Sequence, residues 1–340
     1  MMETSKSAGL SGKGVVFKEK GLVTVEEFAV KPLEQGQVLV RTVSTLVSSG
    51  TETAFLMALP NTTGRFPIYP GYSNAGVVAA VRGETSRFKV GDTVVSSGNH
   101  ASYVTADEDA LITIPEGLPF DEASFFALGS IALQGVRKAG IELGESVVVL
   151  GQGLVGNLAL QLAKLSGGMP VIGVDMYDYR LGKSEECGAD YVLNSSRVTL
   201  EEKVKEITEG KGANVVIEAT GTPEAIPSAL ELASKYGRVI ILGSTRGASQ
   251  VNFYSSVHKK GVSVIGAHNI TRPRYESSHG WWTEQDDSSL VLKLLRKGLL
   301  KVRSLVTAKV SFRRAAEAYR RLIESKDDTL GIILEWRKED

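Results

Sequence analysis

Three glycines at the spacing G-x-G-x-x-G carry the strongest chemical signal in this sequence. Gly151, Gly153 and Gly156 directly follow the apolar run SVVVL and precede the helix-like stretch NLALQLAK. In that context the first glycine permits a tight turn, the second lets a diphosphate approach the backbone, and the third lets helix and strand pack closely. The N–H groups at the positive end of the helix, where Leu154 and Val155 lie, would meet the phosphates. The pattern predicts a dinucleotide site; the alternative is a turn without a ligand.

An acidic residue follows at the distance that such a site needs. Asp175 ends the next apolar run, PVIGVD. Its carboxylate would accept hydrogen bonds from the adenosine ribose and repel a 2′-phosphate, which favours NAD over NADP. Arg180 keeps NADP open, because a guanidinium can bind a phosphate. Thr220 and Gly243 end two further apolar runs, and we expect them at the same ligand-binding edge.

Elements that would position these residues can be read along the chain. From about residue 14 to 115 the apolar runs are short and alternating, which is typical of β-structure. After a helical stretch at 119–140, strand and helix patterns alternate, and this predicts an α/β fold with a doubly wound parallel sheet. The expected strands are 146–151, 170–175, 191–194, 214–220, 238–243, 261–269 and 330–336. The expected helices are 154–167, 179–189, 200–210, 223–237, a helix-length stretch after 243, 288–300 and 312–326. The last strand needs a partner, and the β-rich first part is the natural host.

Composition excludes several classes of protein. The 39 basic and 39 acidic residues balance, so neither nucleic acid nor a membrane surface is expected as a partner. The expected partner is a small-molecule substrate. The single cysteine, Cys187, rules out an internal disulfide and a thiolate metal cluster. The first residues lack the apolar core of a signal peptide, and no run of about 18 apolar residues occurs. We therefore expect a cytoplasmic protein.

The order of these parts, together with GQVLVRTVSTLVSSGTE, YPGYSNAGVV, FKVGDTVV, LGESVVVLGQGLVG and AAEAYRRLIESKDDTLGIILEW, resembles the medium-chain dehydrogenase/reductase superfamily of the alcohol dehydrogenase type. The resemblance spans nearly the whole chain. It implies a GroES-like, β-rich catalytic domain at 1–127, a Rossmann NAD-binding domain at 128–267, and a return to the catalytic domain at 268–340. It also implies a homodimer or homotetramer.

The resemblance further implies where zinc ligands would stand. The cysteine position of the first ligand motif is Ser49, the histidine and glutamate of the second fall on Tyr72 and Ser73, and the later ligand corresponds to Ser130. Hydroxyls are poor zinc ligands beside thiolate or imidazole. The four histidines show no metal-ligand spacing, and no four-cysteine lobe is present. We expect no metal.

Without zinc, hydrogen bonds or a proton donor must assist hydride transfer. Thr51 falls on the family's hydroxyl relay position, and Tyr72 would direct its phenol to the former metal position. Glu52 matches an acid that orients its neighbours. His268, just after the last expected Rossmann strand, is an acid or base candidate. Each has a simpler interpretation: Thr51 closes a turn, Tyr72 fills space, Glu52 pairs with an arginine, and His268 is a surface histidine.

A cluster of arginines and aromatic residues follows His268. The stretch RPRYESSHGWW holds Arg272, Arg274, Tyr275, His279, Trp281 and Trp282. Such residues line a pocket or a subunit contact, or they pack in the core.

Three functions follow from these observations. The leading one is a zinc-independent, NAD-dependent dehydrogenase acting on a secondary alcohol or its ketone, with a polyol, cyclitol or sugar-like substrate. The zinc-free pattern around FLMALPNTTGRFPIYPGYSNAG resembles bacteriochlorophyllide-type and sugar or cyclitol dehydrogenases. The alternatives are a zinc-free ene or quinone reductase using NAD(P)H and a non-catalytic NAD(H)-binding protein.

Overall fold

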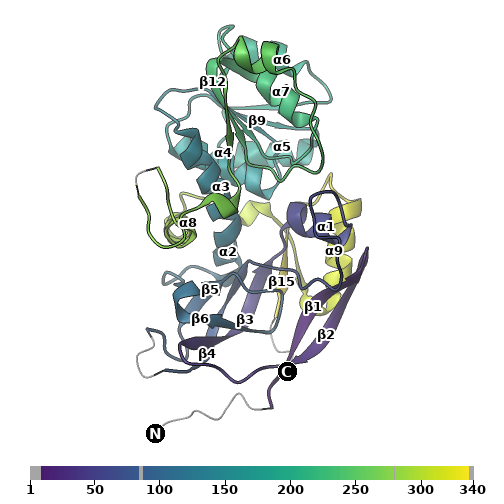
Figure 1. Ribbon diagram of the computed structural model, residues 1–340, viewed down its shortest axis with the longest axis vertical. Coiled ribbons are helices and arrows are strands. Elements are labelled where there is room, and N and C mark those ends of the chain that lie inside the picture. The colour runs from purple at the N-terminus through teal and green to yellow at the C-terminus, as the bar shows by residue number, and fades with distance from the viewer. Residues whose placement is uncertain (1–8, 84–86, 279, 337–340) are drawn as a thin grey trace. The chain divides into compact units, whose positions relative to one another are not determined.

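The computed structural model describes residues 9–83, 87–278 and 280–336, and the chain divides into two compact units (Figure 1). The first unit is formed by 1–127, 288–325 and 331–340, and the second by 128–287 and 326–330. The second change of domain was expected at 267/268, whereas the two compact units divide at 287/288. The segment from 268 to 287 belongs with the second unit because it bonds to helix α3 (Phe126–Ala139), as described below.

The first unit is built on a seven-stranded sheet. The strand order is β14-β15-β3-β4-β5-β7, with β6 also paired to β3, and β1 and β2 form a separate antiparallel pair. The strands are β1 (Ser11–Glu19), β2 (Leu22–Ala29), β3 (Gln37–Leu46), β4 (Asn74–Val81), β5 (Thr93–Ser96), β6 (Tyr103–Asp107), β7 (Ile112–Thr113), β14 (Val306–Ser311) and β15 (Gly331–Glu335). The helices are α1 (Ser49–Leu56), α2 (Phe120–Ala123) and α9 (Ala315–Glu324), while α8 (Glu284–Arg296) crosses from the second unit into the first.

The closing strand β15 is inserted into the sheet of the first unit. It pairs antiparallel with β3, with Leu334 opposite Thr45, and parallel with β14. The closing strand therefore finds its host in the β-rich part, as expected. A buried core joins β1, α1, α9 and β15, with Phe17 packed edge-on against Tyr319 at 5.0 Å between ring centroids.

Two elements of the first unit differ from the sequence expectation. Helix α1 lies inside the stretch expected to be β-structure, because Ser, Gly and Thr are weak helix formers and hide it. Its start is held by the Glu52 side chain, whose Oε1 accepts a 2.8 Å hydrogen bond from the Ser48 backbone N–H. Strand β14 was not predicted; it forms through its pairing with β15.

The second unit is a doubly wound α/β domain. Its six strands are all parallel in the order β10-β9-β8-β11-β12-β13, so the order reverses between β8 and β11. The strands are β8 (Val147–Leu150), β9 (Val171–Asp175), β10 (Tyr191–Asn194), β11 (Ala213–Glu218), β12 (Ala233–Ile241) and β13 (Ser263–Gly266). The helices are α3, α4 (Leu154–Leu165), α5 (Asp178–Glu186), α6 (Leu200–Ile207) and α7 (Ala225–Leu232). The α/β class predicted from the alternating pattern is confirmed.

One boundary in this unit was predicted wrongly. The expected helix at 223–237 ends at Leu232, and the chain continues as β12 from Ala233, which pairs with Ala213 of β11. Sheet pairing therefore overrides the helical pattern of that stretch. Across the described part of the chain, no helix is long and apolar enough to cross a membrane.

Candidate functional site

The glycine-rich turn has the geometry of a phosphate cradle. Gly151 has φ +85°, a conformation that favours glycine, and Gly153 is the N-cap of α4. A Cβ on Gly156 would lie 1.7 Å from the Gly151 carbonyl oxygen, whereas a Cβ on Gly153 would meet no atom within 4 Å. Gly156 thus allows α4 to press against the turn, and Gly153 leaves an open approach to the first-turn amides of Leu154 and Val155.

Asp175 lies at the end of β9, beside this turn. Its Oδ2 accepts a 2.7 Å hydrogen bond from the Gln152 backbone N–H, and its Oδ1 accepts from the Met176 and Tyr177 N–H groups at 2.8 and 3.0 Å. Arg180 Nη1 is 3.7 Å from Oδ2. A carboxylate oxygen accepts about two hydrogen bonds, so Oδ2 retains acceptor capacity for a sugar hydroxyl.

A buried carboxyl group organises the next two strand ends. Glu218, the last residue of β11, accepts hydrogen bonds at Oε1 from the Thr220 backbone and hydroxyl and from the Gly221 N–H, while its backbone oxygen accepts from the Gly243 N–H at 2.7 Å. Glu218 is fully buried, and its Oε2 has no partner among the described residues. Burial raises the pKa of this carboxyl group. Thr220 and Gly243 are therefore held at one edge through Glu218.

In the first unit, Glu52 is the centre of a buried hydrogen-bond cluster. Its Oε2 lies 2.9 Å from His100 Nε2 and accepts a hydrogen bond from the Tyr319 hydroxyl. All three side chains are almost completely buried. Burial, followed by the nearby Glu52 charge, raises the pKa of Tyr319 well above its usual range, so the phenol stays a donor. Glu52 is thus engaged with neighbours at both oxygens, and its partner is a histidine where an arginine was considered.

Tyr72 is linked to the same cluster. Its half-buried phenol donates a hydrogen bond to Ser48 Oγ, and the Ser48 N–H is the group held by Glu52. Gly71 precedes Tyr72 with φ +106°, and a Cβ on Gly71 would lie 2.4 Å from the backbone nitrogen of His100. Thr51 is half-buried in the first turn of α1. The turn before Tyr72 therefore packs against His100, and this packing fixes the position of the segment that carries the phenol.

His268 is exposed at the start of a short 3₁₀ turn, Asn269–Thr271. Its Nδ1 accepts a 3.2 Å hydrogen bond from the Ile270 N–H, and its carbonyl oxygen accepts from Gln134 Nε2 at 3.1 Å. The imidazole therefore caps a turn in addition to any chemical role. Its catalytic role stays a prediction, as do those of Thr51, Glu52 and Tyr72.

Comparison with known proteins assigns this architecture. The family model described as alcohol dehydrogenase GroES-like domain matches residues 34–116, and that described as zinc-binding dehydrogenase matches 155–283. The chain belongs to the medium-chain dehydrogenase/reductase superfamily. The D-guloside 3-dehydrogenase of Escherichia coli is 26% identical over 77% of this chain and 75% of the relative. A sorbitol dehydrogenase of Bacillus subtilis is 22% identical over 95% and 96%. The galactitol-1-phosphate dehydrogenase structure from Escherichia coli superposes with a TM-score of 0.84 at 20% identity, over 95% of this chain and 99% of that one.

Membership of the medium-chain dehydrogenase/reductase superfamily makes the chain an oxidoreductase of the dehydrogenase type. Ser130, which the family resemblance places at the third zinc-ligand position, lies on α3. Its Oγ accepts a 2.6 Å hydrogen bond from Arg272 Nη1, and its carbonyl oxygen accepts from Arg272 Nη2. Both oxygens of Ser130 therefore accept hydrogen bonds from the Arg272 guanidinium.

Several residues of these clusters escaped sequence reasoning. His100 was counted only among the histidines, and Tyr319, Glu218 and Gln134 were not singled out. One signal was available: Ser130, Gln134, Arg137 and Lys138 recur at helical spacing and therefore share one face of α3. His279 of the aromatic cluster lies outside the described residues.

Proposed function

We propose that this medium-chain dehydrogenase/reductase transfers hydride between NAD(H) and a secondary alcohol or its ketone, without zinc, on a polyol, cyclitol or sugar-like substrate. The observation that carries the proposal is the open glycine turn with Asp175 beside it. A bound nicotinamide would supply the hydride acceptor or donor, while this chain's residues hold the diphosphate and the ribose.

Asp175 favours NAD over NADP on electrostatic grounds. A 2′-phosphate next to this buried carboxylate would be repelled, and the Arg180 guanidinium already lies 3.7 Å from the carboxylate. A ribose hydroxyl, by contrast, donates to the remaining acceptor capacity of Oδ2.

The ligand positions implied by the superfamily do not fit zinc. Ser49, Tyr72 and Ser130 offer hydroxyls, which are poor zinc ligands. The Ser130 hydroxyl is also bonded to the Arg272 guanidinium, whose positive charge would repel a metal ion. Within the described residues, no group of three or more His, Cys, Asp or Glu side chains is placed to hold a metal ion.

Proton transfer falls to hydroxyl groups in this proposal. Tyr72 is half-buried, and its hydroxyl is bonded to Ser48 Oγ. When the Ser48 hydroxyl rotates to donate in this bond, the phenol proton becomes available to a developing alkoxide. Glu52 positions this segment through the Ser48 N–H, and Thr51 lies within the same helical turn. The polyol class is supported by the sorbitol and guloside dehydrogenases among the relatives.

The test is alcohol-dependent formation of NADH by purified protein, with metal content measured on the same sample. We expect turnover with a panel of polyols and cyclitols after chelation, and a loss of about 10²-fold or more in kcat for Tyr72→Phe with little change in NADH affinity. NADH oxidation only by activated alkenes or quinones would favour the reductase alternative. Cofactor binding without any hydride exchange would favour a binding protein, and stoichiometric zinc needed for turnover would contradict the zinc-free mechanism.

A further inference from the structure

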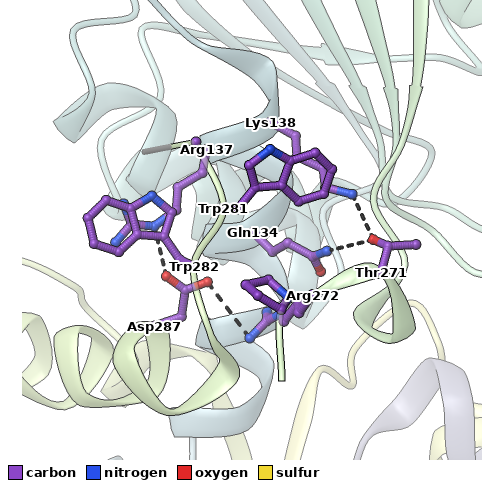
Figure 2. Close-up of a pocket in the computed structure, with 10 residues that line it drawn as sticks. Gln134, Arg137, Lys138, Thr271, Arg272, Trp281, Trp282 and Asp287 are labelled. Atoms are coloured by element: carbon purple, nitrogen blue, oxygen red, sulfur yellow. Dashed lines mark hydrogen bonds and ion pairs between the residues drawn. The ribbon is translucent and has the colours of Figure 1, made fainter. Parts of the chain in front are cut away.

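Buried polar side chains commonly hold parts of a chain together. The cluster of arginines and aromatic residues after β13 is an example: Trp281 and Trp282 line a small pocket between α3 and the loop after β13 (Figure 2). The charged groups of the pocket pair with one another, since Asp287 lies 2.7 Å from Arg137 Nε and 3.7 Å from Arg272 Nη1. About 10 Å³ is left, room for roughly one water. These groups therefore attach the loop to the helix.

Ser48 has a hydroxyl that does not stabilise the helix it begins. Serine is preferred at a helix N-cap because its hydroxyl oxygen accepts a hydrogen bond from an N–H group of the first turn. Ser48 is the N-cap of α1, but its side chain makes no such bond. Instead, Glu52 Oε1 accepts from the Ser48 N–H at 2.8 Å, and the Glu52 N–H donates to the Ser48 carbonyl oxygen at 2.9 Å. The Ser48 backbone is thus fixed at both ends, and its hydroxyl is left for another contact.

That contact is the phenol of Tyr72. Ser48 is 4% exposed, and among the described residues the bond to Tyr72 is the one hydrogen bond of its hydroxyl. Tyr72 is only half-buried. Either hydroxyl can be the donor in this bond, because each proton rotates about its own C–O bond.

The burial of Ser48 decides between these two directions. With the phenol as donor, the Ser48 proton is shielded from water and has no acceptor among the described residues. A buried donor without a partner costs more free energy than an unused acceptor site on an oxygen that already has one bond. With Ser48 as donor, the proton of the half-buried phenol turns away from Ser48, where water or a substrate oxygen can accept it. The second direction is therefore favoured.

His100 fixes both partners of this bond. Its Nε2 lies 2.9 Å from Glu52 Oε2, and Glu52 holds the Ser48 N–H. Its backbone N–H donates at 2.8 Å to the carbonyl oxygen of Pro70, which precedes Tyr72 by two residues. All of these residues belong to the first unit. Packing inside one unit therefore sets the approach of the two hydroxyls.

We propose that Ser48 is a positioning residue for proton transfer by Tyr72: its hydroxyl donates to the phenol oxygen, turns the phenol proton toward the substrate and stabilises the phenolate that remains. In ketone reduction the Tyr72 O–H bond breaks, its proton joins the alkoxide oxygen, and the electron pair stays on the phenolate oxygen. Ser48 keeps its own proton throughout, and alcohol oxidation returns the proton to Tyr72. A hydrogen bond donated to the charged form favours that form. This inference rests on the proposed function for the role of Tyr72, whereas the direction of the Ser48–Tyr72 bond does not.

A double-mutant cycle tests this role. Ser48→Ala should lower kcat for alcohol oxidation by about tenfold to a hundredfold with KM for NAD nearly unchanged, because the phenolate loses its donor and the cofactor contacts remain. In the Tyr72→Phe variant the same substitution should change kcat less than about twofold, because no phenolate forms. Ser48→Thr keeps the hydroxyl and should restore most of the lost kcat.

Stability separates this role from helix capping. Because the Ser48 hydroxyl does not cap α1, Ser48→Ala should leave the melting temperature close to that of the parent protein. Ser48→Cys, whose thiol is a weaker donor, should lose less kcat and serves where Ser48→Ala fails to fold. Ser124→Ala is the matched control, since Ser124 is also buried in the first unit and its hydroxyl donates to the Asp121 carbonyl oxygen at 2.7 Å. Its kcat should stay within about twofold of the parent value.

A measurement without turnover tests the bond itself. Tyrosine labelled at the ring ζ carbon gives an NMR signal for each tyrosine, and the signal missing in Tyr72→Phe is that of Tyr72. Titration of this signal with pH reports ionisation of the phenol. In Ser48→Ala the midpoint should rise by roughly one pH unit, because a donor to the phenolate is lost while the neighbouring Glu52, His100 and Tyr319 stay in place.

Three results would overturn the proposal: full kcat in Ser48→Ala while Tyr72→Phe loses its activity, equal losses from Ser48→Ala with and without Tyr72→Phe, or an unchanged titration midpoint. Failure of the proposed function gives a different result. A parent protein that oxidises no alcohol, or Tyr72→Phe with full kcat, removes the proton-transfer role of Tyr72. The titration then decides by itself whether Ser48 donates to the phenol.

Discussion

At the scale of single residues, Asp175 stabilises the glycine turn and repels phosphate with the same carboxylate. Asp175→Asn removes the negative charge and keeps one acceptor oxygen, which can serve either the Gln152 N–H or the Met176 and Tyr177 N–H groups. We expect the ratio of kcat/KM for NAD to that for NADP to fall by about tenfold to a hundredfold, because roughly 1.4 to 2.8 kcal/mol of repulsion is lost. Initial rates with both cofactors measure it.

A second substitution identifies the source of any gain with NADP. Without the carboxylate, Arg180 is left to bind a 2′-phosphate, so adding Arg180→Met to Asp175→Asn should remove most of the new NADP activity. An unchanged cofactor ratio in Asp175→Asn would mean that the adenosine ribose lies elsewhere.

Glu218 predicts a pH dependence of stability. Its pKa is raised in the folded protein because burial disfavours the charged form. A raised acid pKa contributes stability at low pH that is lost as the pH rises through the folded value. Glu218→Gln stays neutral, so its melting temperature relative to the parent should increase with pH from about 4.5 upward. Thermal melts at several pH values check this, and a difference that does not change with pH would contradict it.

At the scale of elements, close packing of α4 on its turn separates the two roles that the sequence pattern predicts for Gly153 and Gly156. Gly156→Ala must move the helix away from the Gly151 carbonyl and should cost about 1 to 3 kcal/mol in the free energy of unfolding. Gly153→Ala meets open space at φ −67°, so it should leave stability nearly unchanged while weakening NADH binding by steric exclusion. Denaturant unfolding and NADH titration distinguish the two.

A control in the same domain completes that comparison. Gly182 lies within α5, with no atom within 4 Å of an added Cβ. Gly182→Ala should stabilise the helix by about 0.5 to 1 kcal/mol. If Gly156→Ala raised the free energy of unfolding as Gly182→Ala is expected to do, this would contradict close packing of α4 on the turn.

Helices α1 and α9 are joined through Tyr319 and Glu52. Tyr319→Phe keeps the ring against Phe17 but removes the hydrogen bond to Glu52, which should lower the free energy of unfolding by about 1.5 to 3 kcal/mol. NADH affinity should not change. Chemical denaturation is the measurement, with exposed Tyr236→Phe as the control; equal stability of the two variants would exclude a structural role for this bond.

Local patterns predicted the elements better than the clusters that join them. The glycine turn and Asp175 follow from spacing within one strand-turn-helix unit, so the sequence reveals them directly. Glu52 bonds to His100 and Tyr319 across 48 and 267 residues, and Arg272 reaches Ser130 across 142. Such partnerships depend on tertiary packing, which no local pattern encodes. Helix α1 was missed for a related reason, since its side-chain contacts compensate for weak helix formers.

At the scale of the whole molecule, we propose that copies of this chain assemble through an edge of the parallel sheet. Strand β13 ends the parallel sheet, and Val264 in it is 46% exposed. Such an edge pairs readily with another chain, and the superfamily resemblance implies a homodimer or homotetramer. We expect light scattering to give an oligomer whose mass falls in Val264→Lys but not in Val90→Lys, a matched change at an exposed position in the first unit. A monomeric parent protein would contradict this.

The pairing of β15 with β3 bears on the order in which the two units mature during synthesis. Residues 128–287, most of the second unit, leave the ribosome before Gly331–Glu335 is made, and domains fold as units as they emerge. The first unit stays without one of its central strands until translation has passed residue 335. A chain truncated just before Gly331 would contain nearly all of the second unit, but β3 would lack its pairing with β15. Such an unpaired strand edge promotes aggregation.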